Sequence, residues 1–154
     1  ILAKGGTATD AAIAMMLVLT LVEPQSSGVG GGGFLVHHDA DTNMIATIDG
    51  RETAPAAATP DRFLGPHGKP RGFIDVVPGG LSVGVPGNIA LAAKAHAAHG
   101  TLPWAKLFEP AIALAENGFV MNPRLHQSLK GNKGRADKSD YARSVFFGPD
   151  GEPL

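Results

Sequence analysis

A glycine cluster between an apolar segment and a strand-like segment constrains this chain more than any other feature. Residues 28–33 hold five glycines in six positions and formally contain a GxGxxG pattern. A dinucleotide-binding loop follows a strand and opens a helix. Here the apolar run 11–22 comes first, Pro24 ends it, and the strand-like residues follow. We therefore interpret the glycines as permitting unusual backbone angles and close approach of neighbouring chain, without a phosphate ligand.

The residues on either side of the cluster predict a buried helix and a β-hairpin. Thr7 and Asp10 form a pattern like a capping box, which predicts a helix over 9–22. This helix is apolar on every side, so we expect neighbours to enclose it. Residues 34–38 and 44–49 predict two antiparallel strands joined by a turn-rich loop. Both strands carry apolar groups on both faces, so we expect a sheet covered on both sides.

The rest of the chain is less regular. Residues 53–87 are rich in Pro, Gly and Ala and predict a long ordered loop with one short strand near 72–77. Further helices are expected over 88–99, where Gly100 would supply a left-handed cap, and over 103–118 and 122–130. Trp104 belongs to the apolar stripe of its helix, and the charged residues after 130 are typical of a solvated loop.

Composition excludes several classes of partner and site. At 154 residues and 44% hydrophobic, the chain predicts one domain over 1–154. A net charge of -1 gives no general attraction to nucleic acid, and there is no cysteine. We expect no metal site, because His37 and His38 are adjacent on a strand and must point to opposite faces. The start at Ile1 and the turn-rich end predict a fragment truncated at both ends.

Two segments carry a resemblance to a known family. The sequences EPQSSGVGGGGF (23–34) and DGRETAPAAAT (49–59) resemble the large subunit of the γ-glutamyltranspeptidases. The likeness extends through 5–12, 79–87 and 100–105 and so covers most of the chain. It implies an α+β fold, as part of the four-layer αββα arrangement of the N-terminal nucleophile hydrolases. The chain would then be part of the large (N-terminal) subunit.

The resemblance also implies a mechanism that needs a second subunit. Precursors of this family cut themselves, and the new N-terminal Thr of the small subunit is the nucleophile, with its own amine as base. The γ-glutamyl group of glutathione or another γ-glutamyl compound then passes to water, an amino acid or a dipeptide. This chain has no Thr-Thr pair, so we assign it no catalytic residue and no cofactor, and we expect it to be inactive alone. Relatives are often periplasmic or secreted, which is our expectation for localisation.

Arg51 is the candidate substrate-binding residue. In the family, the Arg of this motif holds the α-carboxylate of the glutamyl group, a task suited to a planar, bidentate, permanently charged donor. Glu52 is a candidate supporting residue and could equally be a plain ion-pair partner. A serine triad using Ser26 and Ser27 lacks the Gly-x-Ser-x-Gly elbow. Gln25 stands where many relatives carry His, which leaves the fine specificity open.

Two alternatives stay open from the sequence. Acylases that act on glutaryl-cephalosporins belong to the same superfamily and also present a terminal carboxylate to an Arg, so Arg51 cannot separate the two activities. A non-catalytic module could retain the scaffold without its partner. A Thr-Thr-His processing segment further along the full-length protein would distinguish the enzyme from the module.

Overall fold

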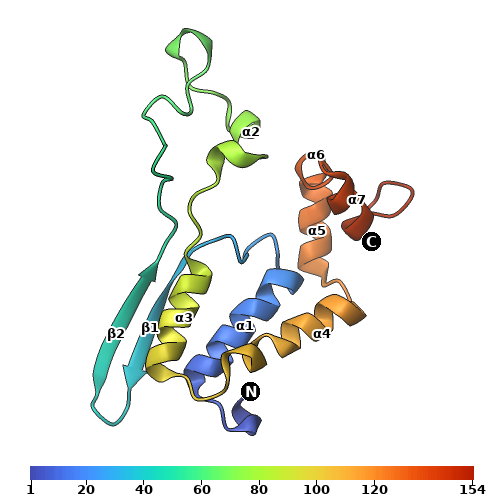
Figure 1. Ribbon diagram of the computed structural model, residues 1–154. Helices are drawn as coiled ribbons and strands as arrows, with labels where there is room; N and C mark the ends of the chain where they lie inside the picture. Colours follow the sequence, from blue (N-terminus) through green and yellow to red (C-terminus); the bar gives the residue numbers. More distant parts are fainter.

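A computed structural model describes the whole chain, Ile1–Leu154. It contains one β-hairpin, an adjoining layer of helices, and a long loop that extends away from both (Figure 1). The α-helices are α1 (Ala8–Val22), α2 (Phe73–Val76), α3 (Asn88–His99), α4 (Glu109–Asn117), α5 (Pro123–Gly131), α6 (Lys133–Ala136) and α7 (Asp140–Phe146). The strands are β1 (Gly33–Asp39) and β2 (Met44–Gly50). Short 3-10 helices span Leu2–Lys4, Pro66–Gly68, Gly80–Ser82 and Trp104–Leu107.

Helix α1 begins where the capping residues predict. The Thr7 hydroxyl accepts from the Asp10 backbone N–H, and the Asp10 carboxylate accepts from the Thr7 backbone N–H, so the capping box is complete. The helix packs between α3 and α4. Their shared core has four buried side chains, Ile13, Leu17, Ala92 and Leu107. Trp104 packs against this core and is partly buried, which agrees with its apolar helical spacing.

The hairpin has the predicted strands, each within one residue of the expected bounds. Its register pairs Val36 with Thr47 and His37 with Ala46. His37 faces the helices and His38 faces solvent, which confirms that adjacent strand histidines point apart. The other face carries Phe34 and Val36, each 70% exposed. The expected cover is therefore present on one face only. The structure shows one sheet and one layer of helices, so the four-layer arrangement is not visible in these residues.

Three local predictions were wrong. Residues 72–77 contain the short helix α2 instead of a strand. The polar segment after residue 130 contains α6 and α7, and α7 starts at a Ser139 cap that accepts from the Ala142 N–H. These helices form because they contribute to a second small core of Leu125, Leu129 and Phe147. The predicted helix over 103–118 is divided into a 3-10 turn and α4.

Gly100 was also predicted wrongly, and its true role involves Asp10. Its φ is -87°, so it is no left-handed cap. A Cβ at this position would lie 2.8 Å from Asp10 Oδ1 and 2.8 Å from the His96 carbonyl oxygen. Glycine is needed here because the end of α3 closes tightly over a buried carboxylate.

The carboxylate of Asp10 joins three parts of the fold. It is fully buried. Its Oδ2 accepts from the backbone N–H groups of Thr7 at 2.9 Å, Thr101 at 3.0 Å and Leu102 at 3.2 Å, and from the Thr101 hydroxyl at 3.1 Å. His96 Nε2 lies 3.7 Å from Oδ1 and donates to the Leu102 carbonyl at 2.7 Å. Asp10 thus attaches the loop after α3 to the start of α1.

We expect Asp10 to make the fold sensitive to acid. Burial alone raises its pKa, but the hydrogen bonds from Thr7, Thr101 and Leu102 outweigh burial and lower the pKa from 3.8 to about 2. Because the pKa of Asp10 is lower in the folded state than in the unfolded state, ionised Asp10 stabilises the fold by about 2 kcal/mol. This stabilisation is complete above about pH 4 and is lost as the pH falls towards about 2. Thermal unfolding midpoints of the full-length protein across this window should depend less on pH in Asp10→Asn. Asp41→Asn, on the exposed hairpin loop, should retain the parent slope.

Much apolar surface is left uncovered. The accessible area is 10064 Å², whereas a compact monomer of 15.8 kDa exposes about 7,300 Å². The excess includes the outer sheet face and one side of α1, where Met15 is 62% exposed. The expectation that neighbours enclose α1 on every side is therefore met only in part. No helix in the chain combines the length and apolar character needed to cross a bilayer.

Candidate functional site

Arg51 follows the last residue of β2 and begins the long loop. The Arg51 N–H donates to Asp49 Oδ1 at 2.9 Å, which fixes the direction of the chain as it leaves the sheet. The Arg51 side chain is 64% exposed, and its Nη1 lies 3.1 Å from Glu52 Oε2. Oε2 is buried and receives no well-aligned hydrogen bond. The ion pair with Arg51 is therefore what offsets the burial of that oxygen.

A polar cavity of about 530 Å³ lies beside this ion pair. Arg51 and Glu52 line it together with the glycine cluster and the turn before that cluster. The remaining lining residues are Met16, Pro24, Gln25, Ser26, Ser27, Gly28, Gly31, Gly32, Gly33, Phe34, Asn88 and Leu91. Arg51 also lines two smaller cavities, of about 350 and 270 Å³. Arg51 thus borders three hollows, and its exposed side chain is accessible to a ligand.

The glycine cluster lets the backbone of Glu52 approach closely. A Cβ on Gly32 would lie 2.6 Å from the Glu52 nitrogen and 2.7 Å from Glu52 Oε2. Any larger residue at position 32 would displace Glu52, which is the ion-pair partner of Arg51. Close approach is the requirement here, because no glycine in 28–33 has a positive φ. The close approach expected from the sequence is therefore confirmed, whereas the expected unusual backbone angles are not found.

The start of α3 holds the cluster from the opposite side. The backbone N–H groups of Gly87 and Asn88 both donate to the Gly31 carbonyl at 3.0 Å. The Asn88 side chain donates to the Gly28 carbonyl at 2.9 Å. Sequence reasoning missed Asn88, since its partners lie about 60 residues away and leave no local pattern.

The turn before the glycine cluster, which also lines the cavity, is bound to the start of α5. Asn122 donates to the Val22 carbonyl and to Glu23 Oε1, both at 3.0 Å. Arg124 forms an ion pair with Glu23 and donates to Ser26 Oγ at 2.9 Å. The Ser26 hydroxyl is thus bonded to an arginine, and no histidine hydrogen-bonds a serine in this chain, so no triad is formed.

The histidines do not assemble a metal site. No group of three or more His, Asp or Glu side chains has a metal-binding arrangement. His37 and His99 stack with ring centroids 3.7 Å apart, and His37 Nδ1 lies 3.4 Å from Thr9 Oγ1. In two stacked, nearly parallel rings the nitrogen lone pairs lie in separate planes and do not converge on one metal ion. The two rings connect β1 to the end of α3.

Comparison with known proteins identifies the family. A family model described as Gamma-glutamyltranspeptidase matches residues 1–154, and the chain belongs to this family. It is 42% identical over 154 residues to the glutathione hydrolase proenzyme of Bacillus subtilis (strain 168), matching all of this chain and 26% of that one. The chain thus spans about a quarter of the length of the curated relatives it matches.

Solved structures show the same arrangement of elements. The γ-glutamyltranspeptidase of Helicobacter pylori superposes with a TM-score of 0.90 at 35% identity, covering 99% of this chain and 43% of that one. A cephalosporin acylase from Bacillus halodurans superposes with a TM-score of 0.71 at 31% identity, covering 91% of this chain and 26% of that one. The described residues therefore correspond to part of a larger mixed α/β structure.

Proposed function

We propose that this chain forms the substrate-binding part of an enzyme that cleaves γ-glutamyl amides, such as a glutathione hydrolase or γ-glutamyltransferase. The main support is the position of Arg51, an accessible guanidinium at the side of a polar cavity. Its planar N–H groups can hold the two oxygens of a substrate carboxylate. Glu52 orients the guanidinium through its ion pair.

The remainder of the reaction belongs to residues outside this chain. An N-terminal Thr on the small subunit would attack the γ-carbonyl of the bound donor, while its amine accepts the hydroxyl proton. As the γ-amide bond breaks, the Thr amine would pass this proton to the departing amine of the donor, which leaves a γ-glutamyl ester on the Thr. Water, an amino acid or a dipeptide would then attack the ester carbonyl, take up the γ-glutamyl group and free the Thr hydroxyl. The part played by Arg51 is to fix the acid end of the donor, so that the γ-carbonyl reaches this nucleophile at a defined distance.

We propose that the small subunit, from the same precursor, covers the exposed sheet face. The chain exposes about 2,700 Å² more than a compact monomer of its mass would. Phe34, Val36 and Ile45 on that face are 67 to 70% exposed. Both strands also have one unpaired edge, and a sheet edge readily accepts another strand. The B. subtilis relative is named as a proenzyme, which supports processing into subunits.

Replacing Arg51 by alanine in the full-length processed protein tests the proposal. Loss of a bidentate charged contact should remove about 2 to 4 kcal/mol of binding free energy. The kcat/KM for a γ-glutamyl anilide should therefore fall roughly 30- to 900-fold, mainly because KM rises. Arg51→Lys should recover part of the loss. Arg71→Ala changes an arginine on the same long loop that does not line the cavity, and it should behave as the parent. Unchanged kinetics for Arg51→Ala would exclude the assigned role.

The acylase remains the second candidate function, and the likeness to the B. halodurans acylase supports it. A glutaryl anilide has the same terminal carboxylate as the γ-glutamyl donor but lacks the α-amino group. Higher kcat/KM for the glutaryl donor would favour the acylase. A butyryl anilide lacks the carboxylate, so its weak turnover should not depend on Arg51 in either case. No cleavage of any donor by a processed protein would favour the non-catalytic module.

A further inference from the structure

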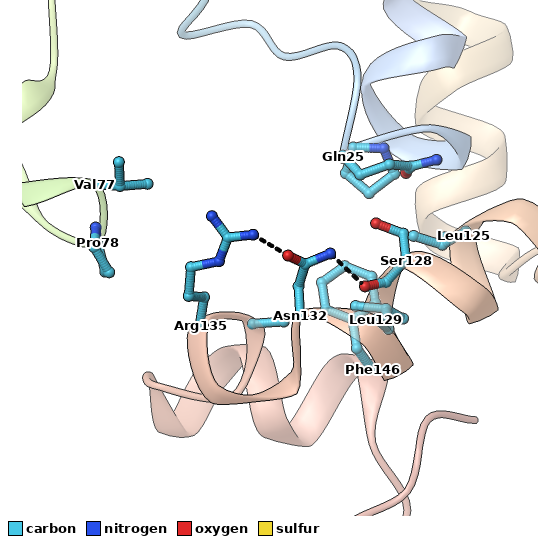
Figure 2. Close-up of a pocket in the computed structure, with 11 residues that line it drawn as sticks. Gln25, Val77, Pro78, Leu125, Ser128, Leu129, Asn132, Arg135 and Phe146 are labelled. Atoms are coloured by element: carbon cyan, nitrogen blue, oxygen red, sulfur yellow. Dashed lines mark hydrogen bonds between the residues drawn. The ribbon is translucent and has the colours of Figure 1, made fainter. Parts of the chain in front are cut away.

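A second cavity lies on the other side of the turn that borders the Arg51 site. Its volume is about 460 Å³. Pro24 and Gln25 line both cavities, so the two hollows adjoin at this turn. Figure 2 shows the second cavity between the Val77–Pro78 segment and the helices of the second core. Its other lining residues are Leu125, Ser128, Leu129, Asn132, Arg135, Ala136 and Phe146.

The lining combines an apolar side with one cation. Leu125, Leu129 and Phe146 supply a hydrophobic surface from α5 and α7. The Arg135 guanidinium extends into the open space between Asn132 and the Val77–Pro78 segment (Figure 2). A surface of this kind suits a small ligand with an apolar body and one negatively charged end.

Arg135 is held in place without being neutralised. Its Nη2 donates to Asn132 Oδ1, and the Asn132 amide donates to the Ser128 carbonyl at 2.9 Å. The acceptor Asn132 is uncharged, and no Asp or Glu lies within ion-pair distance of Arg135. Arg51, Arg124 and Arg143 each have a carboxylate partner. Arg62 and Arg71 bond only to backbone carbonyl groups, as Arg135 bonds only to an amide, but neither lines this cavity. Arg135 therefore presents an oriented positive charge with most of its N–H groups free.

We propose that this second cavity binds the peptide portion of the donor, with Arg135 receiving the terminal carboxylate of that portion. The proposal rests on the proposed function, because a γ-glutamyl peptide carries one carboxylate on its glutamyl end and another on its peptide end. Arg51 and Arg135 supply one accessible guanidinium in each of two adjoining cavities. Val77 and Phe146, the partly exposed apolar residues of the lining, would contact the peptide side chain. Arg135 is thus a specificity-determining residue for peptide donors.

Two donors that differ only in the second carboxylate test this assignment. One is a γ-glutamyl dipeptide with a free C-terminal acid, and the other is the same dipeptide amidated at its C-terminus. For the full-length processed enzyme we expect a KM about tenfold lower for the acid than for the amide, because the acid gains a charge-assisted hydrogen bond. In Arg135→Gln the ratio of the two KM values should fall to about one. Arg135→Lys should give an intermediate ratio.

Matched controls separate this role from a structural one. Lys138→Gln removes a nearby exposed cation that does not line the cavity, and it should retain the tenfold ratio. An equal loss for both donors in Arg135→Gln would indicate a structural role and overturn the proposal. A parent enzyme with equal KM values for the acid and the amide would also overturn it. So would an Arg135→Gln enzyme with a lower melting temperature and an unchanged KM ratio, the result expected if the rest of the polypeptide fills the cavity. Arg51→Ala should raise KM for acid and amide alike, so failure of the proposed function is detected separately.

Discussion

The Asp10→Ala protein should be less stable than the parent by about 3 to 5 kcal/mol, the largest effect we expect from a single substitution. The substitution removes one buried carboxylate oxygen that accepts four hydrogen bonds. Three of the donors are backbone N–H groups, at Thr7, Thr101 and Leu102, and they would remain buried without an acceptor. The start of α1 would lose its cap, and the loop after α3 would lose its attachment.

Amide hydrogen exchange in the full-length protein can locate this effect. Protection of the Thr101 and Leu102 amides should fall most, together with that of the first turn of α1. Asp39→Ala is the matched control, because its carboxylate also accepts two backbone N–H groups but lies at the hairpin loop. We expect Asp39→Ala to cost clearly less stability than Asp10→Ala. Equal costs for the two variants would show that burial and the long-range contacts of Asp10 contribute nothing.

Gly87→Ala should damage both the fold and the proposed site at Arg51. A Cβ on Gly87 would overlap the Gly50 carbonyl oxygen and lie 2.7 Å from the Gly50 carbonyl carbon and 3.3 Å from the Arg51 carbonyl oxygen. These are backbone atoms, so neither side can move away by changing a rotamer. We expect a loss of stability of about 3 kcal/mol, at the upper end of the usual range for overpacking.

The displaced segment is the one that places Arg51, so kinetics give a second measurement. Any Gly87→Ala enzyme that folds and is processed should show a raised KM for γ-glutamyl donors, with a thermal midpoint several degrees below that of the parent. Gly134→Ala provides the control, because a Cβ there meets no atom within 4 Å. Alanine in this short helix should be neutral or stabilising by up to about 1 kcal/mol. A parent-like Gly87→Ala enzyme would contradict the close contact between the start of α3 and the end of β2.

The parts of the fold that were predictable depend on local signals. The Thr7 and Asp10 cap, the alternating strands and Pro24 are each encoded within a few neighbouring residues. Helix α7 also had a local signal, the Ser139 cap, but its charges obscured it, and Phe147 at its end becomes buried only against α5. The role of Gly100 depends on a carboxylate 90 residues away, which no local pattern records.

The candidate site divides in the same way. The family motif at 49–59 identifies Arg51 and Glu52, and the structure places both beside one cavity. The opposite side of that cavity depends on Asn88 and on Glu23, whose partners lie about 60 and 100 residues away. Arg135 carried no signal, because its significance comes from having no acidic partner after folding.

The exposed apolar residues on the outer face of the hairpin favour binding to another polypeptide but lower the solubility of the isolated chain. Phe34, Val36 and Ile45 would have to be replaced by polar side chains for this stretch to remain dispersed when expressed by itself. The same replacements would remove the surface on which we place the small subunit. Polar replacements that keep the isolated piece soluble should therefore weaken its binding to the rest of the polypeptide.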